Sequence, residues 1–145
     1  MVQFRSTQHS REGAGGAPAL DTEGGLLMLK NPQLQFDHLG VPTTEPQPGE
    51  SYIPDLGIWV TDPQAHPSRV EFIRAEAGSP LPELMKRLPH VAFQIPAGTT
   101  LAEMLAGEEV VFLPYEVQAG RLSVAFIRKY GILFEFMQFT DGPAG

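Results

Sequence analysis

The chain has 145 residues, of which 42% are hydrophobic and 19% are charged, and this composition is typical of one globular domain. The formal net charge of -7 argues against nucleic acid and against anionic membrane as partners, because both attract clustered lysine and arginine. The absence of cysteine excludes disulfides, thiolate catalysis and cysteine-based zinc sites. No apolar run approaches the roughly 18 residues of a membrane span. The first residues do not form a secretory signal pattern, so a cytoplasmic location is the expectation.

The first 33 residues differ in composition from the rest of the chain. Residues 10–18 are rich in glycine and alanine and have no hydrophobic periodicity, so they offer little surface to bury. We expect residues 1–33 to form a flexible N-terminal extension, with the apolar residues 26–29 able to dock. Residues 34–145 are then expected to form a single domain.

Short apolar runs separated by proline, glycine and aspartate predict strands along this domain. The expected strands cover residues 34–41, 57–61, 69–74, 90–95, 110–113, 122–127 and 132–139. We expect a loop at residues 42–54, where proline, threonine and glutamate are common.

Two helices are expected as well. Residues 80–88 carry leucine and methionine at helical spacing, with Ser79 as the expected N-cap and Pro80 at the first helical position. A second, shorter helix is expected over residues 100–106, capped by Thr99 or Thr100 and ended by Gly107.

An internal repeat runs through these elements. Asp-His-Leu-Gly-Val at 37–41 matches Pro-His-Val-Ala-Phe at 89–93, and Val-Glu-Phe-Ile at 70–73 matches Phe-Glu-Phe-Met at 134–137. Each copy therefore opens with a histidine-bearing strand and closes with a glutamate-bearing strand. This order predicts two tandem modules, at about 34–79 and 86–140, with the first module abbreviated because a loop replaces its helix.

Strand alternation divides the side chains of the first histidine strand between two faces. Leu39 and Val41 share one face, whereas His38 and Gly40 share the other, and the second histidine strand divides in the same way. We expect the apolar face to pack against a helix and the histidine face to line a cavity.

Two carboxylates lie within apolar runs. Glu71 and Glu135 are flanked by valine, phenylalanine and methionine, and a carboxylate buried there without a partner would be costly or would keep its proton. A cation held between the strands would compensate the charge, and two imidazoles would supply the other protein ligands. The repeated order His38, Glu71, His90, Glu135 therefore predicts a divalent metal site. These nitrogen and oxygen donors suit Zn, Ni, Mn, Co, Mg or Fe.

Three longer segments resemble the vicinal-oxygen-chelate superfamily, which includes glyoxalases, bleomycin-resistance proteins and methylmalonyl-CoA epimerases. The sequence FDHLGV resembles the first strand of these proteins, PHVAFQI resembles the start of their second module, and VAFIRKYGILFEFMQF resembles their closing hairpin. The resemblance covers about residues 34–139. It implies an α+β fold of two tandem βαβββ modules, the glyoxalase/bleomycin-resistance/dioxygenase fold, with metal ligands at His38, Glu71, His90 and Glu135.

The resemblance also implies an activity. A lyase or an isomerase/epimerase of this kind acts on a small substrate with neighbouring oxygens through an enolate-like intermediate. The catalytic residues would be Glu71 and Glu135, with Glu71, displaced from the metal, as the candidate base and Glu50 as a weaker one. We expect a small-molecule substrate, no nucleic-acid or membrane partner, and a homodimer.

Two alternative functions remain open. If Glu71 does not bind the metal, His38, His90 and Glu135 form a two-histidine, one-carboxylate triad suited to a non-haem Fe(II) dioxygenase. A metal-free protein that binds a small ligand, as resistance proteins of this superfamily do, is the other alternative. It is disfavoured because all four ligand positions are filled.

The remaining chemically versatile residues are weaker candidates. His9 lies in the extension, and His66 lies in a proline-containing loop where we expect it in solvent. Trp59 is expected to form a cavity wall or to pack in the core. The cations that could hold an anionic group of a substrate are Arg69, Arg74, Arg121, Arg128 and Lys129.

Overall fold

The structure is a computed structural model and describes residues 33–140. The predicted N-terminal extension at 1–33 lies outside the described residues except for Gln33, and so does the docking predicted for residues 26–29.

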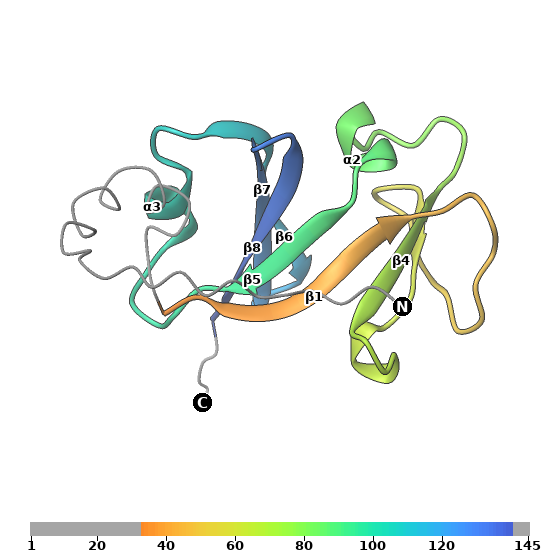
Figure 1. The fold of residues 1–145 in the computed structure, drawn as a ribbon, viewed down its shortest axis with the longest axis horizontal. Coiled ribbons are helices and arrows are strands. Elements are labelled where there is room, and N and C mark those ends of the chain that lie inside the picture. The colour runs from red at the N-terminus through yellow and green to blue at the C-terminus, as the bar shows by residue number, and fades with distance from the viewer. Residues whose placement is uncertain (1–32, 141–145) are drawn as a thin grey trace, which may run out of the picture. The chain divides into compact units, whose positions relative to one another are not determined.

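Eight strands form one sheet within the described part of the chain (Figure 1). In chain order they are β1 (Gln35–Pro42), β2 (Ser51–Ile53), β3 (Ile58–Val60), β4 (Val70–Ala75), β5 (His90–Gln94), β6 (Glu109–Gln118), β7 (Leu122–Lys129) and β8 (Ile132–Phe139). The helices are the short 3-10 helix η2 (Pro63–Ala65) and the α-helices α2 (Glu83–Arg87) and α3 (Leu101–Leu105).

The order of the strands is β2-β3-β4-β1-β5-β8-β7-β6. The two halves of this order mirror each other, because β1, β2, β3 and β4 of the first half take the same places as β5, β6, β7 and β8 of the second. The strands β1 and β5 pair antiparallel at the centre, while β4 lies parallel to β1 and β8 lies parallel to β5. The outer strands of both halves are antiparallel to their neighbours. This arrangement confirms the predicted α+β fold of the glyoxalase/bleomycin-resistance/dioxygenase type. The module boundaries at 34–79 and 86–140 remain predictions.

Local sequence explains several of these elements. The side chain of Thr100 accepts a hydrogen bond from the backbone N–H of Glu103, so this residue caps α3 as predicted. The hairpin β7–β8 turns at Tyr130 and Gly131, which both have positive φ, as the favoured two-residue hairpin turns require.

The helix α2 begins later than the sequence suggested. The predicted helix at 80–88 is confined to Glu83–Arg87, and Pro82, not Ser79, stands at its N-cap. The reason is that a residue before proline avoids the α conformation, so Leu81 cannot be helical in front of Pro82. The hydroxyl of Ser79 instead donates to the carbonyl of Leu56 and accepts from the N–H of Leu81.

Two edge strands were missed or shortened in the prediction. The expected loop at 42–54 contains β2, which pairs with β3 along its whole length, although its three residues are too few to show periodicity. The strand expected at 110–113 extends over Glu109–Gln118 despite Pro114. Proline is tolerated here because β6 is the last strand of the sheet and Pro114 falls where its pairing with β7 shifts register, between Phe112 and Tyr115.

The apolar outer face of the central strands was predicted to pack against a helix, and on β1 this prediction is wrong. Leu39 is 36% exposed and Phe36 is 46% exposed, so the described residues leave this face partly open. The helix α3 instead packs beside β8, β7 and β6. The abbreviated first half has no helix between β1 and β2 that could cover the same face of β1.

The inner face of the sheet encloses the cavity described below. Residues from β3 and from β6, which stand near opposite ends of the strand order, line the same cavity, so the sheet curls around it. None of the helices among residues 33–140 combines the length and apolarity that crossing a membrane would require.

Candidate metal centre and its cavity

The four predicted ligands come from the four central strands. His38 on β1 stands opposite Ala92, and His90 on β5 stands opposite Gly40. Glu71 on β4 is level with Gly40, and Glu135 on β8 is level with Ala92. The two copies of the sequence repeat therefore occupy equivalent positions: His38, Ala92 and Glu135 correspond to His90, Gly40 and Glu71. In both copies a small residue, Ala92 or Gly40, stands opposite the histidine. The repeat alignment predicted from the sequence matches this register.

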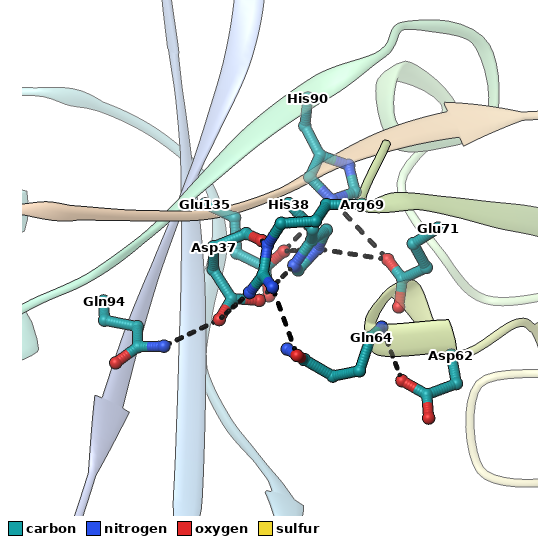
Figure 2. A network of polar contacts seen from close by, with 9 residues as sticks. All are labelled: Asp37, His38, Asp62, Gln64, Arg69, Glu71, His90, Gln94 and Glu135. Carbon is teal, nitrogen blue, oxygen red and sulfur yellow. Dashed lines mark hydrogen bonds and ion pairs between the residues drawn. The ribbon is translucent and has the colours of Figure 1, made fainter. Parts of the chain in front are cut away.

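The structure brings all four side chains together (Figure 2). One donor atom from each lies within 4.8 Å of all the others. Nε2 of His38 is 3.3 Å from Oε1 of Glu71 and 3.2 Å from Oε1 of Glu135. Nε2 of His90 is 3.8 Å and 3.0 Å from the same two oxygens. The four donors thus face a common centre.

The donors fit a divalent cation. Nε2 of His38 and Nε2 of His90 are buried, and neither makes a hydrogen bond of acceptable geometry with another described group. Buried polar atoms in folded proteins nearly always have a partner, and a cation bound between the two nitrogens and the two carboxylates would supply one. Imidazole nitrogens and carboxylate oxygens are donors that first-row divalent metals accept. Their function as ligands remains a prediction.

Asp37 orients one of the imidazoles. The register of β1 against β5 shifts between Phe36 and His38, so Asp37 is the extra residue of a β-bulge. Its side chain is buried, with Oδ2 at 2.6 Å from Nδ1 of His38, while Nε2 of Gln94 donates to Oδ1 at 2.7 Å. A carboxylate at Nδ1 holds the proton there and leaves Nε2 free to bind a metal.

The contact between Asp37 and His38 was not predicted from the sequence. The available signal was an aspartate immediately before a strand histidine, but simple alternation places neighbouring residues on opposite faces. The bulge that brings Asp37 and His38 together depends on pairing with β5, which the local sequence does not reveal.

Gly40 leaves the space that the other imidazole occupies. A Cβ atom at this position would lie 2.0 Å from Cε1, 2.3 Å from Nε2 and 2.5 Å from Nδ1 of His90. No side chain fits there without displacing the ring. Sequence analysis placed Gly40 on the histidine face but did not detect this requirement.

The charges of His38, Glu71, His90 and Glu135, together called the cluster, depend on one another. Burial by itself would lower the pKa of His38, but the adjacent carboxylates of Glu135 and Glu71 outweigh it and raise the pKa to about 11. Burial by itself would raise the pKa of Glu135, and the adjacent imidazoles of His38 and His90 lower it below its usual value. Glu135 is 7% exposed, so the prediction that it is buried is confirmed.

The cluster forms part of the wall of a cavity of about 310 Å³. Most of the other wall residues are aliphatic or aromatic, and they come from β2, β3, β4, β6, β7, β8, α2 and the loops beside them. Phe126 lies edge-on to His90, with 4.9 Å between the ring centroids, and therefore joins the apolar wall to the cluster. The prediction that the histidine face lines a cavity is confirmed.

Several weaker candidates lie elsewhere. Glu50 is held by Arg74 through contacts of 2.6 Å and 2.9 Å, and neither residue lines the cavity. Trp59 is not part of the cavity wall, because Ile58 and Val60 face inward and strand alternation directs Trp59 to the other side. Its ring packs on Tyr52 at 4.8 Å.

The remaining histidine and cations are also separate from the cluster. Nδ1 of His66 accepts a hydrogen bond from the N–H of Ser68, and His66 does not line the cavity. Arg69 donates to the carbonyl of Asp37 and to the side chain of Gln64, so it contacts the residue that orients His38 and forms no hydrogen bond with the cluster itself. None of the five cations proposed from the sequence lines the cavity, and these are Arg69, Arg74, Arg121, Arg128 and Lys129.

Comparisons with known proteins give a likeness in fold. No protein-family model matches the chain, and no curated protein matches its sequence. A crystal structure of a hypothetical protein from Bacillus halodurans C-125 is similar, with a TM-score of 0.55 and 18% identity over 77% of this chain and 98% of that one. A crystal structure of methylmalonyl-CoA epimerase matches with a TM-score of 0.45 and 15% identity over 77% of this chain and 100% of that one. At these identities the comparisons concern the fold alone.

Proposed function

We propose that the chain is a metal-dependent enzyme of the glyoxalase type, a lyase or an isomerase/epimerase, acting on a small substrate with two neighbouring oxygens. The observation that carries this proposal is the pair of buried imidazole nitrogens, free of hydrogen bonds, that face two carboxylates in the wall of a cavity. Four protein donors leave room at a six-coordinate ion for two substrate oxygens.

A divalent ion bound there would act as a Lewis acid toward the substrate oxygens. The protein's own contribution is to hold the substrate and to move a proton at a carboxylate. Glu135 lies at 3.2 Å and 3.0 Å from the two imidazoles, whereas Glu71 lies at 3.3 Å and 3.8 Å. The side chain of Glu71 is also the more exposed of the two, at 19% against 9%. We therefore assign proton transfer to Glu71 and retain Glu135 as the second candidate.

Metal titration tests the site. Metal-free protein is titrated by calorimetry with Zn, Ni, Mn, Co and Mg, and with Fe(II) under anaerobic conditions. We expect one tight site in the wild type and in His66→Ala, the matched histidine control, and its loss in His38→Ala and Glu135→Ala. If the wild type binds none of these ions, the proposal is wrong and a metal-free binding protein replaces it. Tight binding of Fe(II) alone, with oxygen uptake in the presence of substrate, would favour the dioxygenase.

Deuterium exchange tests the reaction class. A panel of small α-hydroxyketones and α-ketoaldehydes is incubated in D₂O with the metal-loaded protein, and exchange at the carbon beside the chelating oxygens is followed by NMR. We expect exchange with at least one compound, and its loss in Glu71→Gln, which keeps the shape of the side chain and removes the base. If Glu71→Gln exchanges deuterium as fast as the wild type, Glu71 is not the base and Glu135 takes its place.

The location, oligomeric state and partners of the protein are part of the same proposal. We infer a cytoplasmic homodimer with a small-molecule substrate and no nucleic-acid or membrane partner. The exposed apolar side chains of Phe36 and Leu39 on the outer face of β1 support an interface between copies. Sedimentation equilibrium of the wild type and of Leu39→Asp tests it, with a dimer expected only in the wild type.

A further inference from the structure

The cavity wall is rich in carboxylates, from Asp37, Asp62, Glu71 and Glu135. Among the described residues that line it there is no lysine and no arginine. Asp62 lines the cavity, with its carboxylate accepting from the N–H of Gln64. Tyr115 lines it too, and burial together with the neighbouring carboxylate of Asp55 raises the pKa of its hydroxyl. A substrate that carried a free carboxylate or phosphate in addition to its chelating oxygens would meet repulsion here and no compensating charge.

Two cations close to residues of the cavity wall, Arg69 and Arg74, already have partners. Arg69 donates to the carbonyl of Asp37 and to the amide oxygen of Gln64. Arg74 pairs with Glu50 at 2.6 Å, outside the cavity. Recruiting either cation for a substrate would break contacts that the fold already uses.

The wall that the substrate body would contact is apolar. Phe126 packs edge-on against His90 at 4.9 Å and against Phe112 at 5.9 Å. Val124 and Met137 continue the wall on the neighbouring strands β7 and β8. Burial of an apolar group against these side chains stabilises a complex in proportion to the area removed from water.

Gln64 places an uncharged amide at the same cavity. The amide oxygen of Gln64 accepts from Nη1 of Arg69 at 3.2 Å, and a guanidinium can only donate. This contact fixes the orientation of the amide, so its NH₂ group keeps its donor capacity for a neutral acceptor such as a carbonyl or hydroxyl oxygen.

From these observations we infer that the substrate is a small molecule with an uncharged, apolar body, and that substrates with a second anionic group, including those carried on a phosphate-bearing group, are excluded. The cavity of about 310 Å³ lies at the small end of the roughly 300–1,000 Å³ found for ligand pockets. This inference rests on the proposed function, because it assumes that the chelating oxygens of the substrate bind a metal held by the cluster.

Four hydroxamates test the inference on the metal-loaded wild type, because they share one bidentate head. Acetohydroxamate lacks an apolar body, benzohydroxamate has one, and the 4-carbamoyl and 4-carboxy derivatives of benzohydroxamate match each other in size and differ in charge. We expect benzohydroxamate to bind at least about tenfold more tightly than acetohydroxamate, as burial of one aromatic ring implies. We expect the carbamoyl compound to bind at least about tenfold more tightly than the carboxy compound. Bound metal is measured after each titration, so that loss of the ion is separated from weak binding.

A charge added at the cavity provides the complementary test. Val117 on β6 lines the cavity and is 40% exposed, so Val117→Arg places a cation there without burying it. We expect this variant to raise the affinity for the carboxy compound, relative to the carbamoyl compound, by at least fivefold. Leu113→Arg is the matched control, because Leu113 lies on the same strand, is 71% exposed and does not line the cavity. It makes the same change in net charge and should leave the ratio as in the wild type.

The outcomes separate this inference from the proposed function. If the wild type binds metal and holds the carboxy compound as tightly as the carbamoyl compound, the uncharged substrate class is wrong while the metal site stands. Equal affinity for acetohydroxamate and benzohydroxamate would refute the apolar body in the same way. If the wild type binds no metal, the proposed function fails, and this inference fails with it.

Discussion

Replacing Gly40 by alanine tests how the fold holds His90 in the cluster. The added Cβ would lie 2.0–2.5 Å from three atoms of the imidazole, whereas ordinary contacts begin at 3.4 Å, so the ring must withdraw by more than an ångström. Metal–nitrogen bonds of about 2.0–2.1 Å tolerate deviations of only about 0.2 Å. Gly40→Ala should therefore remove His90 from the proposed ligand set although it replaces none of the four proposed ligands.

The size of the effect follows from that displacement. Outer-shell substitutions that only misorient a ligand cost about 10–100-fold in metal affinity, and complete displacement should cost at least about 100-fold, or about 2.7 kcal/mol. In the metal-free protein, the extra methyl in a packed interior should cost about 1–3 kcal/mol of unfolding free energy. Competition with a chromophoric chelator measures the first quantity, and urea unfolding measures the second.

A double-mutant cycle with His90→Ala separates the ring from the backbone. In His90→Ala the space beside Gly40 is empty, so adding Gly40→Ala should cost little further affinity and little further stability. We expect a coupling free energy of about 1–3 kcal/mol. If Gly40→Ala keeps metal affinity within about threefold of the wild type, or if its stability loss is the same in both backgrounds, the reasoning is wrong.

Three further predictions concern the cluster. Asp37→Asn should weaken metal binding by about 10–100-fold in a chelator competition, with wild-type secondary structure by circular dichroism, and unchanged affinity would refute the orienting function of Asp37. Saturating metal at about 100 times its Kd should stabilise the wild type by about 2.7 kcal/mol, chelation should reverse the gain, and Glu135→Ala should show no gain in a thermal melt. In the metal-free protein, the contribution of His38 to the free energy of unfolding is fully present below its ordinary pKa of 6.5 and is lost as the pH rises through about 11. The contribution of Glu135 to the same free energy is present above its ordinary pKa of 4.5 and is lost on acidification. Stability should therefore fall between pH 6.5 and 11, and Glu135→Gln should flatten this fall.

The four cluster residues could be predicted because their signal is local and repeated. A histidine among small residues on a strand, followed by a glutamate inside an apolar strand, is visible in each copy without knowledge of the fold. The two occurrences also indicated which strands correspond, and the register of His38 and His90 matches that alignment.

The supporting residues could not be predicted because their effects are long-range. Asp37 reaches His38 only through a bulge against β5, and Gly40 matters only because His90 lies directly opposite. By contrast, the outward position of Trp59 followed from the alternation of Ile58 and Val60, and a stricter use of that pattern would have removed it from the cavity wall.

The symmetric register also bears on how such a site originates. Each half of the sheet contributes one imidazole and one carboxylate, and the central pair β1–β5 is antiparallel, as a twofold axis between identical chains would require. Two copies of a single ancestral half, paired along that strand, would already present four donors around their axis. A duplication and fusion of such a half would need only a linker, and no new ligand. The fused halves could then differ, as the missing helix and the Asp37 bulge of the first half illustrate, while both kept their donors.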